Sequence, residues 1–233
     1  NKFDSLIKGN EPQSGDHVLE IGSGWGSFTF YLISKYPDIT IDTLTISQEQ
    51  YDFVKSKIEE NHLQGNLNVI FKDYREHQGE YSRIYSIEMF EAVGMQYWQI
   101  YFDKIKDLLK PSGIFSMQTI VIFEGLFEKY SQKIDFIQKY IFPGGMLPTV
   151  KTLENIAIEK KLDFFVKNQM ADSYHQTLEM WRQNFNHKWD TIKNLGYSNE
   201  FKRMWNFYLS YCSGGFKAKT IDVFQIDFTK NSN

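Results

Sequence analysis

Three glycines in the stretch EIGSGWGS, residues 20–27, have the spacing G-x-G-x-G and follow an apolar run. Glycine adopts the left-handed backbone of a tight turn and lets a ligand come close to the chain. A dinucleotide-binding loop would need the frame G-x-G-x-x-G, but position 27 is serine. The spacing favours a ligand without a pyrophosphate, such as S-adenosylmethionine, with Gly22 and Gly24 along its amino-acid end and the Glu20 carboxylate opposite its ammonium group. An ordinary strand-to-helix turn is the alternative.

The next two strand ends carry polar side chains that suit the rest of such a ligand. Thr45 and Gln50 stand where a dehydrogenase would place an acidic residue for the ribose. Asp73 could accept a hydrogen bond from an adenine amine, with the backbone of Tyr74 against the ring. Both strand ends also have an ordinary explanation. Ser47 could be the N-cap of the helix after the second strand, and Asp73 could lie in a solvated turn after the third. Their occurrence at successive strand ends favours a binding site.

Two carboxylates, Glu88 and Glu91, lie three residues apart at the end of the expected strand 81–90. A carboxylate stabilises a nearby positive charge and can accept a proton, and two could do so in relay. The ordinary alternative, that the residue caps the following helix or pairs with a lysine, is expected of Glu88 rather than of Glu91.

The alternation of apolar segments predicts an α/β fold with a doubly wound, mostly parallel, seven-stranded sheet. We expect strands in 17–24, 38–47, 66–75, 81–90, 113–123, 162–168 and 220–228, and helices in 26–37, 48–65, 96–113, 128–148, 177–189 and 201–212. The helix in 128–148 is expected to break at Pro143, Gly144 and Gly145. A single catalytic domain is predicted, with a cofactor-binding half in 1–123, a helical, aromatic-rich cap in 124–215 that also supplies one strand, and a last strand in 216–233.

Composition limits the partners. The net charge of −3 argues against nucleic acid. The single cysteine, Cys212, excludes an internal disulfide, and no Cys/His spacing suggests zinc. No apolar run is long enough for a membrane span. A cytoplasmic protein is expected, and the opening NKFDSLIKGN predicts an excised piece whose upstream segment is missing. Aromatic residues make up 17% of the chain, and such residues fill cores or line slots for apolar and cationic ligands.

Seven motifs, taken in order, resemble the catalytic region of the cyclopropane fatty acid synthase family over essentially the whole chain. They are VLEIGSGWGSF, TLTISQEQ, DYR, SIEMFEAVG, FIQKYIFPGGMLP, YHQTLEMWRQNF and RMWNFYLSYCSGGFKAKTIDVFQI. The segments IFPGG-x-LP and YC-x-x-GFK are more specific than the glycine loop.

The resemblance implies a class I methyltransferase that carries a methyl group from S-adenosylmethionine to the double bond of an unsaturated acyl chain of a phospholipid. A carbocation forms, a base removes a proton from the new methyl group, and a cyclopropane ring closes. In the family that base is thought to be a bound bicarbonate. The resemblance also implies peripheral association with the inner face of the membrane. It leaves a homodimer open.

Site residues follow by motif. The resemblance implies that the donor contacts Gly22, Gly24, Thr45, Ile46, Gln50, Asp73, Tyr74 and Ile87. It implies an anion site formed by Ser23, Glu91, Gln118, Ile120 and Tyr174.

Two positions of that anion site depart from the better-known family pattern, because Ser23 replaces cysteine and Gln118 replaces histidine. Both can donate to an anion, but neither titrates near neutrality as histidine does. Proton removal would then fall on Glu91 or on the bound anion. The same departures resemble a branch that includes enzymes forming a methylene or methyl branch, so ring and branch both stay open.

Other functions fit parts of the sequence. N-methylation of a small amine would use the same sheet and the SIEMFE segment, and a lipid- or cofactor-binding protein without chemistry would also fit. The aromatic residues Phe136, Tyr140 and Trp205 either pack the cap or line an acyl tunnel, where each ring could stabilise a cation by about 2 kcal/mol. Core packing is the more ordinary explanation.

Overall fold

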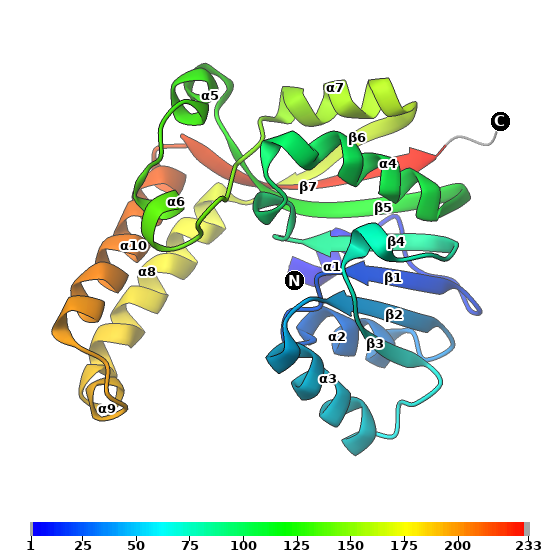
Figure 1. Cartoon of the computed structure of the whole chain (residues 1–233), viewed down its shortest axis with the longest axis horizontal. Helices are drawn as coiled ribbons and strands as arrows, with labels where there is room; N and C mark the ends of the chain where they lie inside the picture. Colours follow the sequence, from blue (N-terminus) through cyan, green and yellow to red (C-terminus); the bar gives the residue numbers. More distant parts are fainter. Residues whose placement is uncertain (1, 231–233) are drawn as a thin grey trace. The chain divides into compact units, whose positions relative to one another are not determined.

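The computed structural model describes residues 2–230 and has a seven-stranded sheet of order β3-β2-β1-β4-β5-β7-β6 (Figure 1). The pairs β1–β2, β2–β3, β1–β4 and β4–β5 are parallel. The strands are β1 His17–Ile21, β2 Thr40–Thr45, β3 Leu67–Phe71, β4 Tyr81–Ile87, β5 Leu109–Ile122, β6 Leu162–Gln169 and β7 Ile221–Lys230. This arrangement confirms the predicted α/β class and all seven expected strands.

The helices alternate with the first strands and then dominate the second half of the chain. They are α1 Lys2–Ile7, α2 Ser27–Lys35, α3 Gln48–Glu60, α4 Trp98–Leu108, α5 Glu124–Ser131, α6 Phe136–Tyr140, α7 Val150–Lys160, α8 Ala171–His187, α9 Trp189–Asn194 and α10 Asn199–Lys217. Local signals fix several starts. Ser47 caps α3 by accepting from the Gln50 N–H, and Asp135 with Gln138 forms a capping box at α6.

The chain divides into two compact units, which we describe separately. The first comprises 2–119, 151–168 and 224–230 of the described residues, and the second comprises 120–150 and 169–223. The domain boundaries expected from the sequence stay a prediction.

The first unit has an apolar core on each face of its sheet. On one face α1, α2 and α3 pack against the strands through side chains such as Leu6, Phe28, Val54 and Tyr85. On the other face α4 packs mainly through aromatic rings, and Phe102 lies 5.0 Å from Phe228 and 6.2 Å from Phe115 between ring centroids. Burial of such large apolar side chains on both faces is what holds a doubly wound sheet together.

The second unit is the helical, aromatic-rich part that the sequence predicted, and in it α8 and α10 run side by side (Figure 1). Phe216, Leu209 and Leu178 form the buried centre of their contact. Cys212 packs at its edge, and desolvation raises the pKa of its thiol to about 12, as expected for a cysteine that acts as a small hydrophobic residue.

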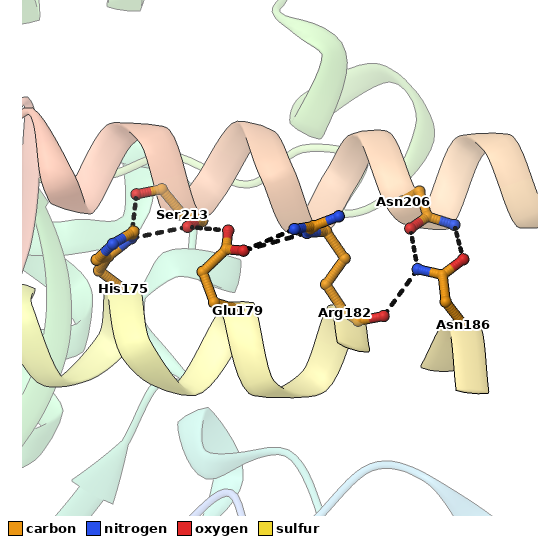
Figure 2. Close-up of polar contacts among 6 residues, drawn as sticks. All are labelled: His175, Glu179, Arg182, Asn186, Asn206 and Ser213. Carbon is orange, nitrogen blue, oxygen red and sulfur yellow. Dashed lines mark hydrogen bonds and ion pairs between the residues drawn. The ribbon is translucent and has the colours of Figure 1, made fainter. Parts of the chain in front are cut away.

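A line of polar contacts also joins α8 to α10. Figure 2 shows the six side chains involved: His175, Glu179, Arg182 and Asn186 of α8 and Asn206 and Ser213 of α10. The buried Ser213 hydroxyl donates to Glu179 Oε1 (2.7 Å) and lies 2.8 Å from His175 Nδ1, and Arg182 donates to Glu179 Oε2 (2.8 Å). The single proton of the Ser213 hydroxyl points to the Glu179 carboxylate. His175 Nδ1 must therefore carry a proton and donate it to the Ser213 oxygen.

Candidate active site

The glycine loop follows β1 at the edge of the sheet where the strand order reverses between β1 and β4, which is where open α/β sheets bind ligands. The N–H groups of Gly22 and Ser23 both donate to Leu44 O of the neighbouring strand, at 3.1 and 2.8 Å. Gly22 has φ +89°, and a Cβ there would lie 2.9 Å from Met89 Cγ. Only glycine fits this position, because both the backbone and the space exclude a side chain.

Gly24 differs from Gly22 in what surrounds it. Its φ is +50°, but a Cβ added there would meet nothing within 4 Å. The loop backbone is therefore open to a ligand at this point. Next to it, Trp25 is 56% exposed and packs edge-on against Phe53 of α3, with ring centroids 5.4 Å apart. An open backbone beside an exposed ring fits a ligand with an apolar or aromatic portion.

Glu20 lies beneath the loop, with only 3% of its surface exposed. Its carboxylate accepts hydrogen bonds from the hydroxyls of Thr29 and Thr43. Desolvation raises the pKa of Glu20 to about 7, and the two threonine hydrogen bonds oppose that rise. The Glu20 carboxylate of β1 thus links β2 and α2 through these two hydrogen bonds. The predicted contact of Glu20 with an ammonium group stays a prediction.

The end of β2 brings together two of the predicted residues. Thr45 Oγ1 donates to Gln50 Oε1 (2.8 Å) and accepts from the Ser47 N–H (3.1 Å). Ile46 between them is 72% exposed. The N-cap function expected of Ser47 is confirmed.

At the end of β3, Asp73 accepts two hydrogen bonds from the Arg75 guanidinium, Nε to Oδ1 at 3.0 Å and Nη2 to Oδ2 at 2.5 Å. The arginine holds the pKa of the Asp73 carboxyl below its usual value. Tyr74 is half-buried, and its ring meets Tyr101 edge-on at 5.2 Å. Any ligand that bonds to Asp73 would share the carboxylate with Arg75.

At the end of β4 and at the neighbouring position of β5, the structure pairs residues differently from the sequence prediction. Ile87 of β4 stands opposite Gln118 of β5 in the parallel ladder, and Glu88 follows directly. Gln118 Nε2 donates to Glu88 Oε1 at 2.7 Å, and Gln118 Oε1 accepts from Gln225 Nε2 at 2.9 Å. Glu88 also lies near a lysine, as expected, because Lys2 Nζ is 3.7 Å from its Oε1.

Glu91 has a different partner. Its Oε1 accepts from the hydroxyl of Thr119, the residue after Gln118, at 3.1 Å. Successive strand residues point to opposite faces of a sheet. The side chains of Gln118 and Thr119, which donate to Glu88 and Glu91, therefore leave β5 in opposite directions. The resemblance implied one anion site with Gln118 and Glu91, and the hydrogen bonds described here join Gln118 to Glu88 and Glu91 to Thr119.

The remaining residues of the predicted anion site fall in both units. In the first unit Ser23 is buried, and its hydroxyl donates to the Gly24 carbonyl at 3.1 Å. In the second unit Ile120 and Tyr174 pack against the same apolar cluster, and the Tyr174 ring lies 5.3 Å from that of Phe216. Their role at an anion stays a prediction.

The amide of Gln118 offers a poor place for an additional anion. An anion accepted by Nε2 would lie within about 5 Å of the Glu88 oxygen that already accepts from it, where two unit charges repel by about 3 kcal/mol at an effective dielectric of about 20. The Glu88 carboxylate therefore disfavours a bicarbonate bound to Gln118 Nε2. No group of three or more His, Cys, Asp or Glu side chains arranged to hold a metal occurs within residues 2–230.

Sequence reasoning missed Gln225, Thr119 and the link from Gln118 to Glu88. Gln225 and Thr119 are fully buried polar side chains within apolar strands. A polar residue in such a segment needs a partner, and that was the available signal, although it could not tell which partner.

The sheet order, the glycine loop at the end of β1 and the helices on both faces define the fold of class I methyltransferases. The sequence profile described as "Mycolic acid cyclopropane synthetase" matches residues 1–226. The chain therefore belongs to this cyclopropane synthase family, as the motifs predicted.

Two curated relatives illustrate the family. The chain is 33% identical over 227 residues to "Tuberculostearic acid methyltransferase UfaA1" of Mycobacterium tuberculosis, which covers 96% of this chain and 52% of the relative. It is 35% identical over 219 residues to the "Cyclopropane-fatty-acyl-phospholipid synthase" of Escherichia coli, which covers 93% of this chain and 54% of that enzyme. The chain thus spans about half the length of these relatives.

Among solved structures, mycolic acid cyclopropane synthase CmaA1 complexed with SAH and CTAB superposes with a TM-score of 0.88 at 25% identity, covering 98% of this chain and 83% of CmaA1. The cyclopropane synthase MmaA2 from Mycobacterium tuberculosis gives a TM-score of 0.87 at 24% identity, covering 98% and 83%, and shows the same fold.

Proposed function

We propose that this protein transfers a methyl or methylene group from S-adenosylmethionine to the double bond of an unsaturated acyl chain of a phospholipid, through a carbocation, and forms a cyclopropane ring. The observation that carries the proposal is the family match, which covers residues 1–226. The E. coli relative supports the phospholipid, because its name includes that substrate. UfaA1, named a tuberculostearic acid methyltransferase, supports the alternative of a branched product.

The residues at the strand ends fit the donor. Gly22 and Gly24 supply a backbone without side chains, and the open space over Gly24 leaves room for a bound molecule. Thr45, Ile46 and Gln50 follow β2, Asp73 and Tyr74 follow β3, and Ile87 ends β4, so that all lie at one edge of the parallel sheet. The donor supplies a methyl group on a sulfonium centre, and these residues bind and orient it.

The acyl chain is assigned to the second unit because its side chains are apolar and accessible. The Phe136 ring lies 5.4 Å from Tyr140 and 4.6 Å from Phe207, and Trp205 stacks at 5.6 Å on Phe201. Tyr140 is 55% exposed, so it does not serve core packing alone. We propose that these rings line the path of the acyl chain.

Peripheral membrane contact follows from such a substrate. None of the helices described between residues 2 and 230 is both long and apolar enough to cross a bilayer. The acyl chain would therefore be reached from the membrane surface, and in the cytoplasm this is the inner face.

The test is lipid mass spectrometry after expression of the full-length protein in a bacterial host rich in monounsaturated phospholipids. We expect unsaturated acyl chains to gain the mass of one methylene unit. Products that resist hydrogenation of double bonds are rings, and products that take up hydrogen are branched alkenes. The control is Gly22→Val, which places a branched side chain against Met89 at a positive φ and should abolish both donor binding and the mass gain.

Two outcomes would contradict the proposal. Lipids of unchanged mass together with binding of S-adenosylhomocysteine would indicate a binding protein or a different acceptor. A methylated small amine in the same cells would indicate the N-methyltransferase alternative.

A further inference from the structure

A directed chain of hydrogen bonds fixes the amide of Gln118. Ser5 Oγ donates to Gln225 Oε1 (2.8 Å), and Gln225 Nε2 donates both to Lys2 O (2.9 Å) and to Gln118 Oε1 (2.9 Å). The oxygen of the Gln118 amide is therefore the acceptor, and its nitrogen faces Glu88 as a donor. Because Gln118 and Gln225 are fully buried, neither amide can turn without breaking the chain of bonds.

The backbone of Glu88 is also held in place. Its φ is +53°, in the left-handed region that residues with a Cβ rarely adopt. Its N–H donates to Gln118 O at 2.8 Å, so that Gln118 binds both the main chain and the side chain of Glu88. Strained non-glycine backbone of this kind gathers at functional sites, where the surrounding structure holds it.

The Glu88 carboxylate lies at the end of β4, the strand that borders the glycine loop of β1. The next residue, Met89, makes the close approach to Gly22 described above. The side chain of Glu88 is 32% exposed, and Lys2 Nζ lies 3.7 Å from its Oε1. A carboxylate is thus presented beside the donor loop, with a route for a proton to solvent.

We propose that Glu88 is the anion that Gln118 holds for the reaction, so that a carboxylate of the chain itself takes the place of a bound bicarbonate. This inference rests on the proposed function. Gln118 donates to Glu88, whereas Glu91 accepts from Thr119. Gln118 is a positioning residue, since it acts through the carboxylate to which it donates.

The proton transfer balances without another reactant. After the alkene carbon has bonded to the transferred methyl carbon, the acyl chain carries one positive charge. A Glu88 oxygen accepts a proton from that methyl group, and the electron pair of the broken C–H bond forms the second carbon–carbon bond of the ring. The neutral carboxylic acid then returns the proton to water through its exposed side.

The test compares the full-length wild type with Glu88→Gly, which suits the positive φ and removes the carboxylate, and with the control Glu154→Gln on the exposed side of α7. Binding of ¹³C-labelled bicarbonate is followed by NMR in the presence of S-adenosylhomocysteine, whose own affinity is measured by calorimetry. We expect no bicarbonate binding to the wild type or the control, binding to Glu88→Gly, and unchanged S-adenosylhomocysteine affinity in all three.

Turnover on monounsaturated phospholipid vesicles is measured in parallel in buffer depleted of carbon dioxide. Glu88→Gly should lose about 100-fold or more in rate, as for loss of a general base, and added bicarbonate or formate should restore part of it. Wild-type turnover should not respond to depletion.

Labelled bicarbonate bound to the wild type, or wild-type turnover that falls on depletion, would overturn the inference. If S-adenosylhomocysteine binds but no lipid product forms, the proposed function fails while the bicarbonate-binding comparison still decides what occupies Gln118.

Discussion

Replacement of Glu20 by glutamine should remove a pH dependence of stability that the fold imposes on this carboxyl group. Desolvation raises the pKa of Glu20 in the folded protein to about 7, whereas its ordinary value is 4.5. The folded state thus binds more protons than the unfolded state between these values. The stability contributed by this group is complete below pH 4.5 and is lost as the pH rises through 7.

The size of the effect follows from that interval. One pKa unit corresponds to about 1.4 kcal/mol, so Glu20 should cost the wild type about 3 kcal/mol between pH 4.5 and about pH 8. A glutamine side chain at this position would stay neutral throughout, and its amide oxygen could still accept from Thr29 and Thr43. The free energy of unfolding of Glu20→Gln, relative to that of the wild type, should therefore rise by about 3 kcal/mol between pH 4.5 and about pH 8. This rise is expected whatever the difference between the two proteins is at pH 4.5.

The assay is urea unfolding at a series of pH values, with the free energies of wild type and variant subtracted at each pH. The subtraction cancels the titration of every other group. Glu154→Gln, the same substitution at an exposed position of α7, is measured as the matched control. A Glu20→Gln difference that does not vary with pH would refute the reasoning, because it would mean that Glu20 ionises as readily in the folded as in the unfolded chain.

Three further predictions concern other parts of the molecule. Gly24→Ala should lower the free energy of unfolding by about 1 kcal/mol, because φ is +50° without a steric clash, and calorimetry should show weaker binding of S-adenosylhomocysteine. Asp42→Asn should cost about 1–3 kcal/mol in urea unfolding, because the buried carboxylate accepts from Tyr81 Oη at 2.8 Å and the new amide cannot satisfy all of its donors. Ser213→Ala should cost about 1–3 kcal/mol by the same measurement without changing S-adenosylhomocysteine affinity, because it leaves the Glu179 carboxylate short of a donor.

The order of strands and helices could be predicted because each element carries its own periodic pattern. Boundaries were less predictable. The strand expected at 113–123 begins earlier, at Leu109. Pro111, Ser112 and Gly113 suggest a turn, but they form an irregular start of the strand, where its register shifts against β4. Ser112 adopts φ +59° there. The helix at 150–160 was not predicted, although it buries Leu153 and Ile156.

The candidate site was predictable as a set of strand ends and not as a set of contacts. The glycine spacing located the loop, and parallel strands bring their carboxyl ends to one edge. The partner of Gln118, however, depends on the register of β4 against β5 and on Gln225, 107 residues away in the chain. Such pairings follow from tertiary packing, which no local pattern encodes.

The polar contacts between α8 and α10 have a consequence for the alignment of the two helices. An apolar face made of similar side chains tolerates sliding by one turn, about 5.4 Å. Such a slip would separate Ser213 from Glu179 and would break the reciprocal amide pair of Asn186 and Asn206, at 2.6 and 3.2 Å, in the same step. Buried polar side chains can select a single register in helical assemblies, and Ser213 is the buried member of these contacts, whereas Asn186 is exposed. The polar contacts thereby hold α8 and α10 in one alignment. The aromatic side chains that these helices carry then have a single set of positions.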